Sequence, residues 1–171
     1  MLNRSEIFAK PEVKKAIATI RDALRGALPE GSFGEREAQA LAINNEALRL
    51  LLREELQAIS DSFGDEVLVN GDPHKFHEPG TDTYHSLCGP LEVSRPSYRM
   101  IGMHNGPIVI ALELAAGLVQ GATPALAYNV THGYAQHDMR IHLENLETAY
   151  RTPPSRATLE RIAKRVASTA V

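Results

Sequence analysis

The C-terminal 21 residues, from Arg151 onward, hold the side chains whose types and spacing best suit a chemical role. Two prolines, at 153 and 154, end any preceding element, and Ser155 is well suited to cap a new helix. Apolar residues then recur at helical spacing, with basic residues on the opposite side. A short basic helix after a tight turn is typical of the second helix of a helix-turn-helix, which enters a DNA major groove. The residues predicted to contact DNA here are Arg151, Ser155, Arg156, Thr158, Arg161, Lys164 and Arg165.

The distribution of charge supports this interpretation. The chain of 171 residues has a formal net charge of −3, yet from Arg151 onward it has five arginines or lysines and one acid. This end therefore carries a net charge of +4, which leaves −7 for the first 150 residues. Such an asymmetry indicates a basic end that meets an acidic partner. The alternative is that the basic residues only complement the dipole at a helix C-terminus.

A second basic group lies in the middle of the sequence. Arg95, Tyr98 and Arg99 fall on a segment with the alternating pattern of a half-buried strand. Side chains on such a strand could lie along a phosphate backbone and position the protein on DNA. We therefore add these three residues to the predicted DNA-binding set.

Histidines and the single cysteine offer an alternative chemistry, which is a zinc site. His74, His77, His85 and Cys88 have an H-x-x-H then H-x-x-C arrangement, a spacing that zinc sites use. In an extended strand, however, His85 and Cys88 point to opposite faces. The turn after Cys88 also lacks the tight knuckle of C-x-x-C pairs. We expect no metal and no cofactor.

Residues arranged for catalysis are not evident in the sequence. Cys88 is near His85 only along the chain, whereas catalytic pairs are neighbours in space and are oriented by a third group. Acidic residues gather between positions 61 and 82, on a predicted helix end and loops, while two-metal phosphoryl transfer needs convergent carboxylates on rigid strands. We therefore expect that the chain is not an enzyme.

The composition indicates a globular protein of a reducing cytoplasm. Apolar residues make up 43% and charged residues 23% of the chain, both ordinary fractions. One cysteine excludes an intramolecular disulfide framework. The N-terminus lacks the pattern of a secretory signal, and no apolar run reaches the ~18 residues of a membrane helix.

Hydrophobic periodicity predicts the elements that position these residues. We expect helices over residues 11–28 and 35–63, and Ser32 with Glu35 has the spacing of a capping box. A strand over 66–71, a loop over 72–82 and strands over 83–88 and 91–101 form a small antiparallel sheet. Further helices are expected at about 108–118, 123–135, 138–150 and 155–168.

The long helix over residues 35–63 has an apolar face that suits two interpretations. Its length of roughly 40 Å and its apolar stripe favour a homodimer arm. The alternative is a helical hairpin that packs on itself or on the next module. Asn45 and Glu55 interrupt a strict heptad pattern, which weakens a long coiled coil. The stripe consists of Leu41, Leu48, Leu52, Leu56, Ile59 and Phe63.

Five stretches of the second part of the chain carry a resemblance to a known family. They are residues 84–93, Arg95 with Tyr98-Arg99, residues 105–107, residues 112–128 and residues 154–162. Together they resemble the N-terminal part of bacterial insertion-sequence transposases of the ISKra type. In that family this part precedes a DDE catalytic domain of RNase-H-like fold, which binds two divalent metals and cuts and joins DNA. The resemblance implies a DNA-recognition role for residues 138–168, and a chain that ends at Val171 lacks the catalytic domain.

The sequence therefore predicts an α+β protein that binds DNA. It has a long N-terminal helical hairpin at residues 1–64, a small antiparallel sheet at 65–104 and a helix-turn-helix-like module at 105–171. The expected function is that of a transposase-derived DNA-binding protein, with a homodimer through residues 35–63 and no contact with a membrane. The alternative is a helical interaction module, such as an assembly partner of a transposase, that does not bind DNA.

Overall fold

The structure, a computed structural model, describes residues 6, 9–27, 31–103, 105–136, 141, 144, 146 and 154–169. Its internal contacts divide the chain into two compact units, Met1–Ala47 and Leu48–Val171. The sequence predicted a first boundary at residue 64, but the division falls inside a long helix. The sheet and the C-terminal helices, predicted as separate modules, belong to one unit.

Two helices predicted for the N-terminal part are confirmed. Helix α2 spans Pro11–Ala27 and helix α3 spans Phe33–Asp61, each within two residues of the expected bounds. The capping box is present at the start of α3, where the Glu35 backbone N–H donates to Ser32 Oγ over 3.3 Å. The Ser32 backbone N–H in turn donates to Glu35 Oε2 over 2.7 Å, and this bond lowers the pKa of the Glu35 carboxyl.

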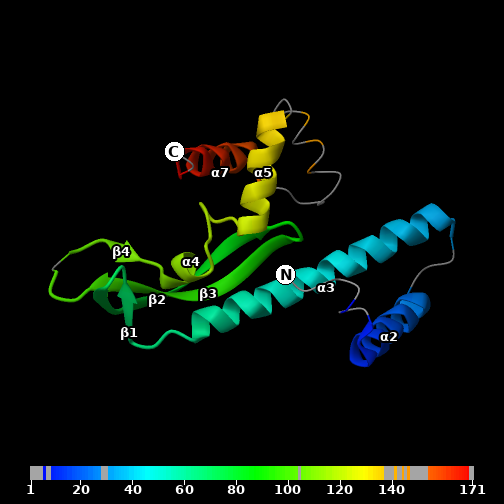
Figure 1. Cartoon of the computed structure of the whole chain (residues 1–171), viewed down its shortest axis with the longest axis horizontal. Coiled ribbons are helices and arrows are strands. Elements are labelled where there is room, and N and C mark those ends of the chain that lie inside the picture. The colour runs from blue at the N-terminus through cyan, green and yellow to red at the C-terminus, as the bar shows by residue number, and fades with distance from the viewer. Residues whose placement is uncertain are drawn as a thin grey trace. The chain divides into compact units, whose positions relative to one another are not determined.

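A four-stranded antiparallel sheet follows α3, which confirms the α+β class. Its strands are β1 (Glu66–Val69), β2 (Asp72–Ser86), β3 (Gly89–Met100) and β4 (Ile108–Val109), in the order β1-β2-β3-β4. The short strands β1 and β4 pair near the open end of the β2–β3 hairpin. The hairpin therefore continues as a two-stranded ribbon toward its turn (Figure 1).

The loop predicted over residues 72–82 is wrong, because these residues form most of β2. Their side chains are nearly all exposed, so they give no alternating apolar signal. The backbone pairs with β3 regardless of side-chain type, and Pro79 faces Pro96 so that both missing N–H donors fall at one position of the ladder. A β-bulge between Phe76 and Glu78 shifts the register once.

The helices after the sheet agree only in part with the sequence-based prediction. The segment predicted as one helix over 108–118 is strand β4 followed by the short helix α4 (Ala111–Ala115). Helices α5 (Pro124–Gln136) and α7 (Arg156–Thr169) confirm the predictions for 123–135 and 155–168. The helix predicted over 138–150 lies mostly outside the described residues.

The last turns of α3 cover the outer edge of β3, where no strand pairs. Gln57 accepts a hydrogen bond from the Ser94 backbone N–H at 2.9 Å and donates to the Ser94 carbonyl at 3.1 Å. Ser60 Oγ donates to the same carbonyl at 2.9 Å, and Arg49 donates to the Pro90 carbonyl at 3.1 Å. These bonds satisfy backbone groups that an exposed edge would leave unpaired. They explain why the second half of α3 belongs with the sheet.

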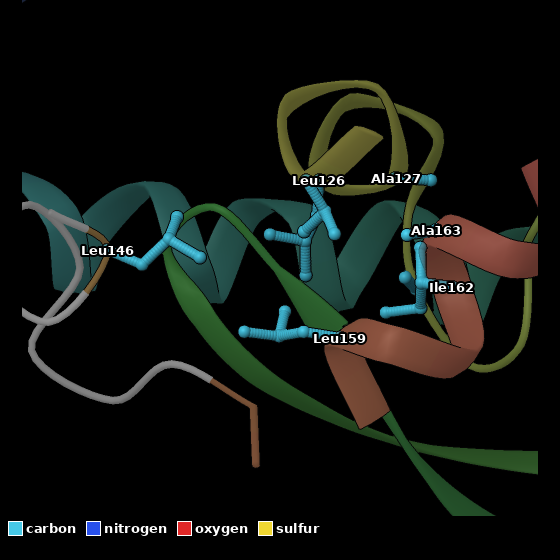
Figure 2. Packing of buried hydrophobic residues seen from close by; sticks show 8 residues of the cluster. Leu126, Ala127, Leu146, Leu159, Ile162 and Ala163 are labelled. Carbon is cyan, nitrogen blue, oxygen red and sulfur yellow. The ribbon is translucent and has the colours of Figure 1, made fainter. Parts of the chain in front are cut away.

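Two hydrophobic clusters form the core of the second unit. The sheet cluster contains five buried residues, which are Leu56, Tyr84, Leu91, Val93 and Leu112. The helical cluster joins α5 to α7 and also includes Leu146 (Figure 2). Its buried members are Ala122, Leu126, Ala127, Val130, Leu146, Leu159, Ile162 and Ala163.

Ile162 allows a direct test of the helical cluster. Its side chain is 0% exposed, so Ile162→Ala should lower the free energy of unfolding by roughly 2–5 kcal/mol. The exposed Lys164→Ala on the same helix is the matched control, with an expected change within about 0.5 kcal/mol. Urea denaturation measures both values, and equal effects of the two substitutions would show that α7 is not held by this cluster.

Candidate nucleic-acid interface

Helix α7 separates an apolar face from a cationic face, as the sequence predicted. Leu159 and Ile162 are both 0% exposed and pack against α5, where Figure 2 shows them facing Leu126. On the other side, the side chains of Arg161, Lys164 and Arg165 are exposed. The helical periodicity thus leaves three cations within five residues on the outer surface.

The start of α7 is capped as expected. Ser155 Oγ accepts a hydrogen bond from the Thr158 backbone N–H at 3.3 Å and lies 3.0 Å from Thr158 Oγ1. Arg156, one position further on, forms an exposed ion pair with Glu160 at 3.0 Å. Exposed i,i+4 pairs contribute only about 0.3–0.5 kcal/mol, so Arg156 can exchange this partner for a phosphate.

The three predicted contacts on the sheet have intramolecular roles. Tyr98 is 0% exposed, and its hydroxyl donates to the Gly64 carbonyl at 3.0 Å, so its assignment to a DNA surface is corrected. The Arg95 side chain is only 18% exposed and pairs with Asp82 at 2.7 Å. Arg99 is half-buried, with its Nη2 atom 3.1 Å from His77 Nε2. The candidate interface is therefore α7.

Two parts of the predicted helix-turn-helix lie outside the described residues. Arg151 is one of them, and most of the helix predicted over 138–150 is the other. In the described part of the chain, α5 is the helix that packs against α7 (Figure 1). The helix-turn-helix arrangement stays a prediction.

The residues of the predicted zinc alternative are spread along the β2–β3 hairpin. His74 and His85 lie eleven positions apart on β2, about 36 Å in an ideal strand. His74 Nδ1 lies 2.9 Å from the Asp72 carbonyl, while Cys88 occupies the turn between β2 and β3. Within the described ranges, no group of three His, Cys, Asp or Glu side chains is placed to hold a metal ion.

A cavity of about 850 Å³ lies beside α7, and sequence reasoning missed it. Its walls come from β2, α4, the loop over 118–121 and α7. The charged and titratable side chains on the walls are Asp82, His85, Glu113, Arg161 and Arg165. One signal was available in the sequence, since Glu113 interrupts the apolar run of residues 108–119.

Two polar contacts organise the acidic side of this cavity. The buried Tyr84 hydroxyl donates to Glu113 Oε1 at 3.3 Å, and burial raises the pKa of Tyr84. The hydrogen bond from Arg95 lowers the pKa of the Asp82 carboxyl. Both carboxylates therefore have a partner within the protein.

His85 connects the β2–β3 hairpin to the loop that precedes α5. Its backbone N–H donates to the Gly121 carbonyl at 2.7 Å, and its carbonyl accepts from the Thr123 N–H at 2.8 Å. Burial of the imidazole lowers the pKa of His85, and the positive charge of Arg161 makes a second, smaller contribution in the same direction. A neutral imidazole thus lines the cavity at neutral pH.

Comparison with protein-family models, curated proteins and solved structures finds no match to this chain. No helix in the described ranges has the length and apolar character needed to cross a lipid bilayer.

The lowered pKa of His85 predicts a pH dependence of stability. As the pH falls below about 6.5, the unfolded chain binds a proton at this position before the folded protein does. The free energy of unfolding should therefore fall from about pH 6.5 down to the pKa of folded His85. His85→Gln should flatten this part of the profile in urea denaturation, and an unchanged slope would contradict the assignment.

Proposed function

We propose that this protein binds DNA through the cationic face of α7. The observation that carries the proposal is the exposure of Arg161, Lys164 and Arg165 on a helix whose opposite face is buried. A helix of 14 residues is about 21 Å long and fits the major groove, which is about 12 Å wide. The three cations can then neutralise phosphates on the groove walls.

The start of α7 supports the same orientation on DNA. A helix N-terminus presents backbone N–H groups and the positive end of its dipole, both of which favour a phosphate. Ser155, Arg156 and Thr158 lie at this end and offer hydroxyl and guanidinium groups to the DNA. We propose that Arg151 and a helix over 138–150 complete a helix-turn-helix.

The five sequence stretches that resemble the family support derivation from the N-terminal region of an insertion-sequence transposase. We assign binding and not DNA cleavage to this chain, and we place the function in the cytoplasm.

The salt dependence of binding tests the role of the cations. In the double variant Arg161→Ala, Arg165→Ala, DNA affinity should fall strongly at low salt. The slope of log affinity against log salt should flatten by about 2 if both residues contact phosphate. Fluorescence anisotropy with a labelled duplex measures both quantities, while circular dichroism checks that the variant is folded.

A matched control removes the same charge elsewhere. Lys14 and Lys15 are exposed on α2, and their double change to alanine should leave the salt slope unaltered. If the wild-type protein has no DNA affinity at low salt, or if both double variants lose it equally, the proposal fails. The interaction-module alternative would then take its place.

We also propose that the exposed apolar side chains within residues 35–63 form the contact between two copies of the chain. Leu48, Leu52 and Ile59 lie at helical spacing on α3 and are 41%, 39% and 37% exposed. Exposed apolar side chains in a row favour association with a similar surface. A twofold pair of α7 helices would also match two half-sites on DNA. The alternative is a helical hairpin of residues 1–64, in which this apolar stripe packs within one chain.

Sedimentation equilibrium tests this contact. The double change Leu48→Glu, Leu52→Glu should convert a dimer to a monomer, because two charges would be buried in an apolar contact. The exposed Glu54→Gln on the same helix is the control and should leave the dimer intact. A monomeric wild-type protein at all concentrations would exclude the homodimer.

A further inference from the structure

The cavity beside α7 lies where the two hydrophobic clusters meet. Leu118, at its wall, packs against the sheet cluster, while Val119 and Val166 pack against the helical cluster. These three side chains are half-buried, so each presents part of its apolar surface to the cavity. The cavity therefore lies between the sheet cluster and the helical cluster.

The polar groups of the cavity are divided by charge. Arg161 and Arg165 line the cavity from α7, and Arg165 already has a partner within the protein. The imidazole of His85 lies close enough to Arg161 for the guanidinium charge to lower its pKa. The two carboxylates, Asp82 and Glu113, have Arg95 and Tyr84 as partners. The side of the cavity that faces α7 is thus cationic, and it adjoins the apolar surface.

We propose that this cavity binds a small amphipathic anion, in which a carboxylate or phosphate group is attached to an apolar body. Arg161 would hold the anionic group, and His85 would donate a hydrogen bond to it. The apolar body would lie against Leu118, Val119 and Val166. A volume of about 850 Å³ falls within the usual range of small-molecule sites.

Occupation of the cavity would affect DNA binding. Arg161 cannot hold the anion and a DNA phosphate at once, so the two ligands should compete. This consequence rests on the proposed function, whereas the binding of the anion does not. The two proposals can therefore fail separately.

Nuclear magnetic resonance titration with simple probes tests the site. Phenyl phosphate and benzoate carry the two candidate anionic groups on the same apolar ring, while benzylamine carries a cation. Either anion should shift the backbone amide signals of His85, Val119 and Val166, and the stronger one identifies the preferred group. Benzylamine should leave these signals in place. The bound anion should also raise the pKa of His85, because a negative charge favours the imidazolium.

Four variants separate the anion site from the DNA surface. Arg161→Gln should weaken binding of the anion about tenfold or more, the loss expected for one charge-assisted hydrogen bond. His85→Ala should weaken binding of the anion while leaving DNA affinity unchanged. Lys164→Gln, on the same helix but outside the cavity wall, should weaken DNA binding alone. Lys75→Gln, on β2, controls for net charge.

Three outcomes would overturn the proposal. One is that the anions shift no signals in the cavity, and another is that benzylamine shifts them equally. The third is that Arg161→Gln and Lys75→Gln weaken binding of the anion by the same factor, which would indicate attraction by net charge alone. An anion that binds in the cavity of a protein without DNA affinity would uphold the anion site and reject the DNA proposal.

Discussion

The burial of Leu159 and Ile162 against α5 decides which face of α7 reaches solvent. Both side chains are fully enclosed, and complete burial of a residue of this size contributes about 1.5–3 kcal/mol. Rotation of the helix by half a turn would expose them and bury Arg161 and Lys164. Burying an unpaired cation is strongly unfavourable, so the two effects favour the same orientation. The packing of Leu159 and Ile162 in the helical cluster thus determines that the cationic face of α7 is exposed.

The β2–β3 hairpin holds the loop that precedes α5 and so helps to position the α5–α7 pair. Its outer edge is covered by side chains of α3, and His85 near its turn is bonded on both sides of its backbone to the loop before α5. The hairpin therefore links the sheet cluster to the helical cluster. The cavity lies at this junction because the side chains of the two clusters pack separately and leave the space between them unfilled.

Helical periodicity was sufficient to predict α2, α3, α5 and α7, because apolar residues recur at helical spacing in each of these segments whether or not the stripe is buried. Strand β2 could not be predicted over residues 72–82, since its side chains are exposed and its stability comes from backbone pairing. Tyr98 was misassigned because its sequence neighbours do not show that its ring packs edge-on against Phe63 and Phe76. The cavity is lined by residues between positions 82 and 166, and a local sequence pattern cannot predict contacts between segments so far apart in the chain.

The measurement that tests the central claim most directly maps where DNA touches the protein. A short duplex titrated into isotope-labelled protein should shift the backbone amide signals of residues 156–165 first, with smaller changes on β2 and β3. The arginine side-chain signals of α7 should move in the same titration. Shifts confined to the sheet or to α3, with α7 unchanged, would contradict it.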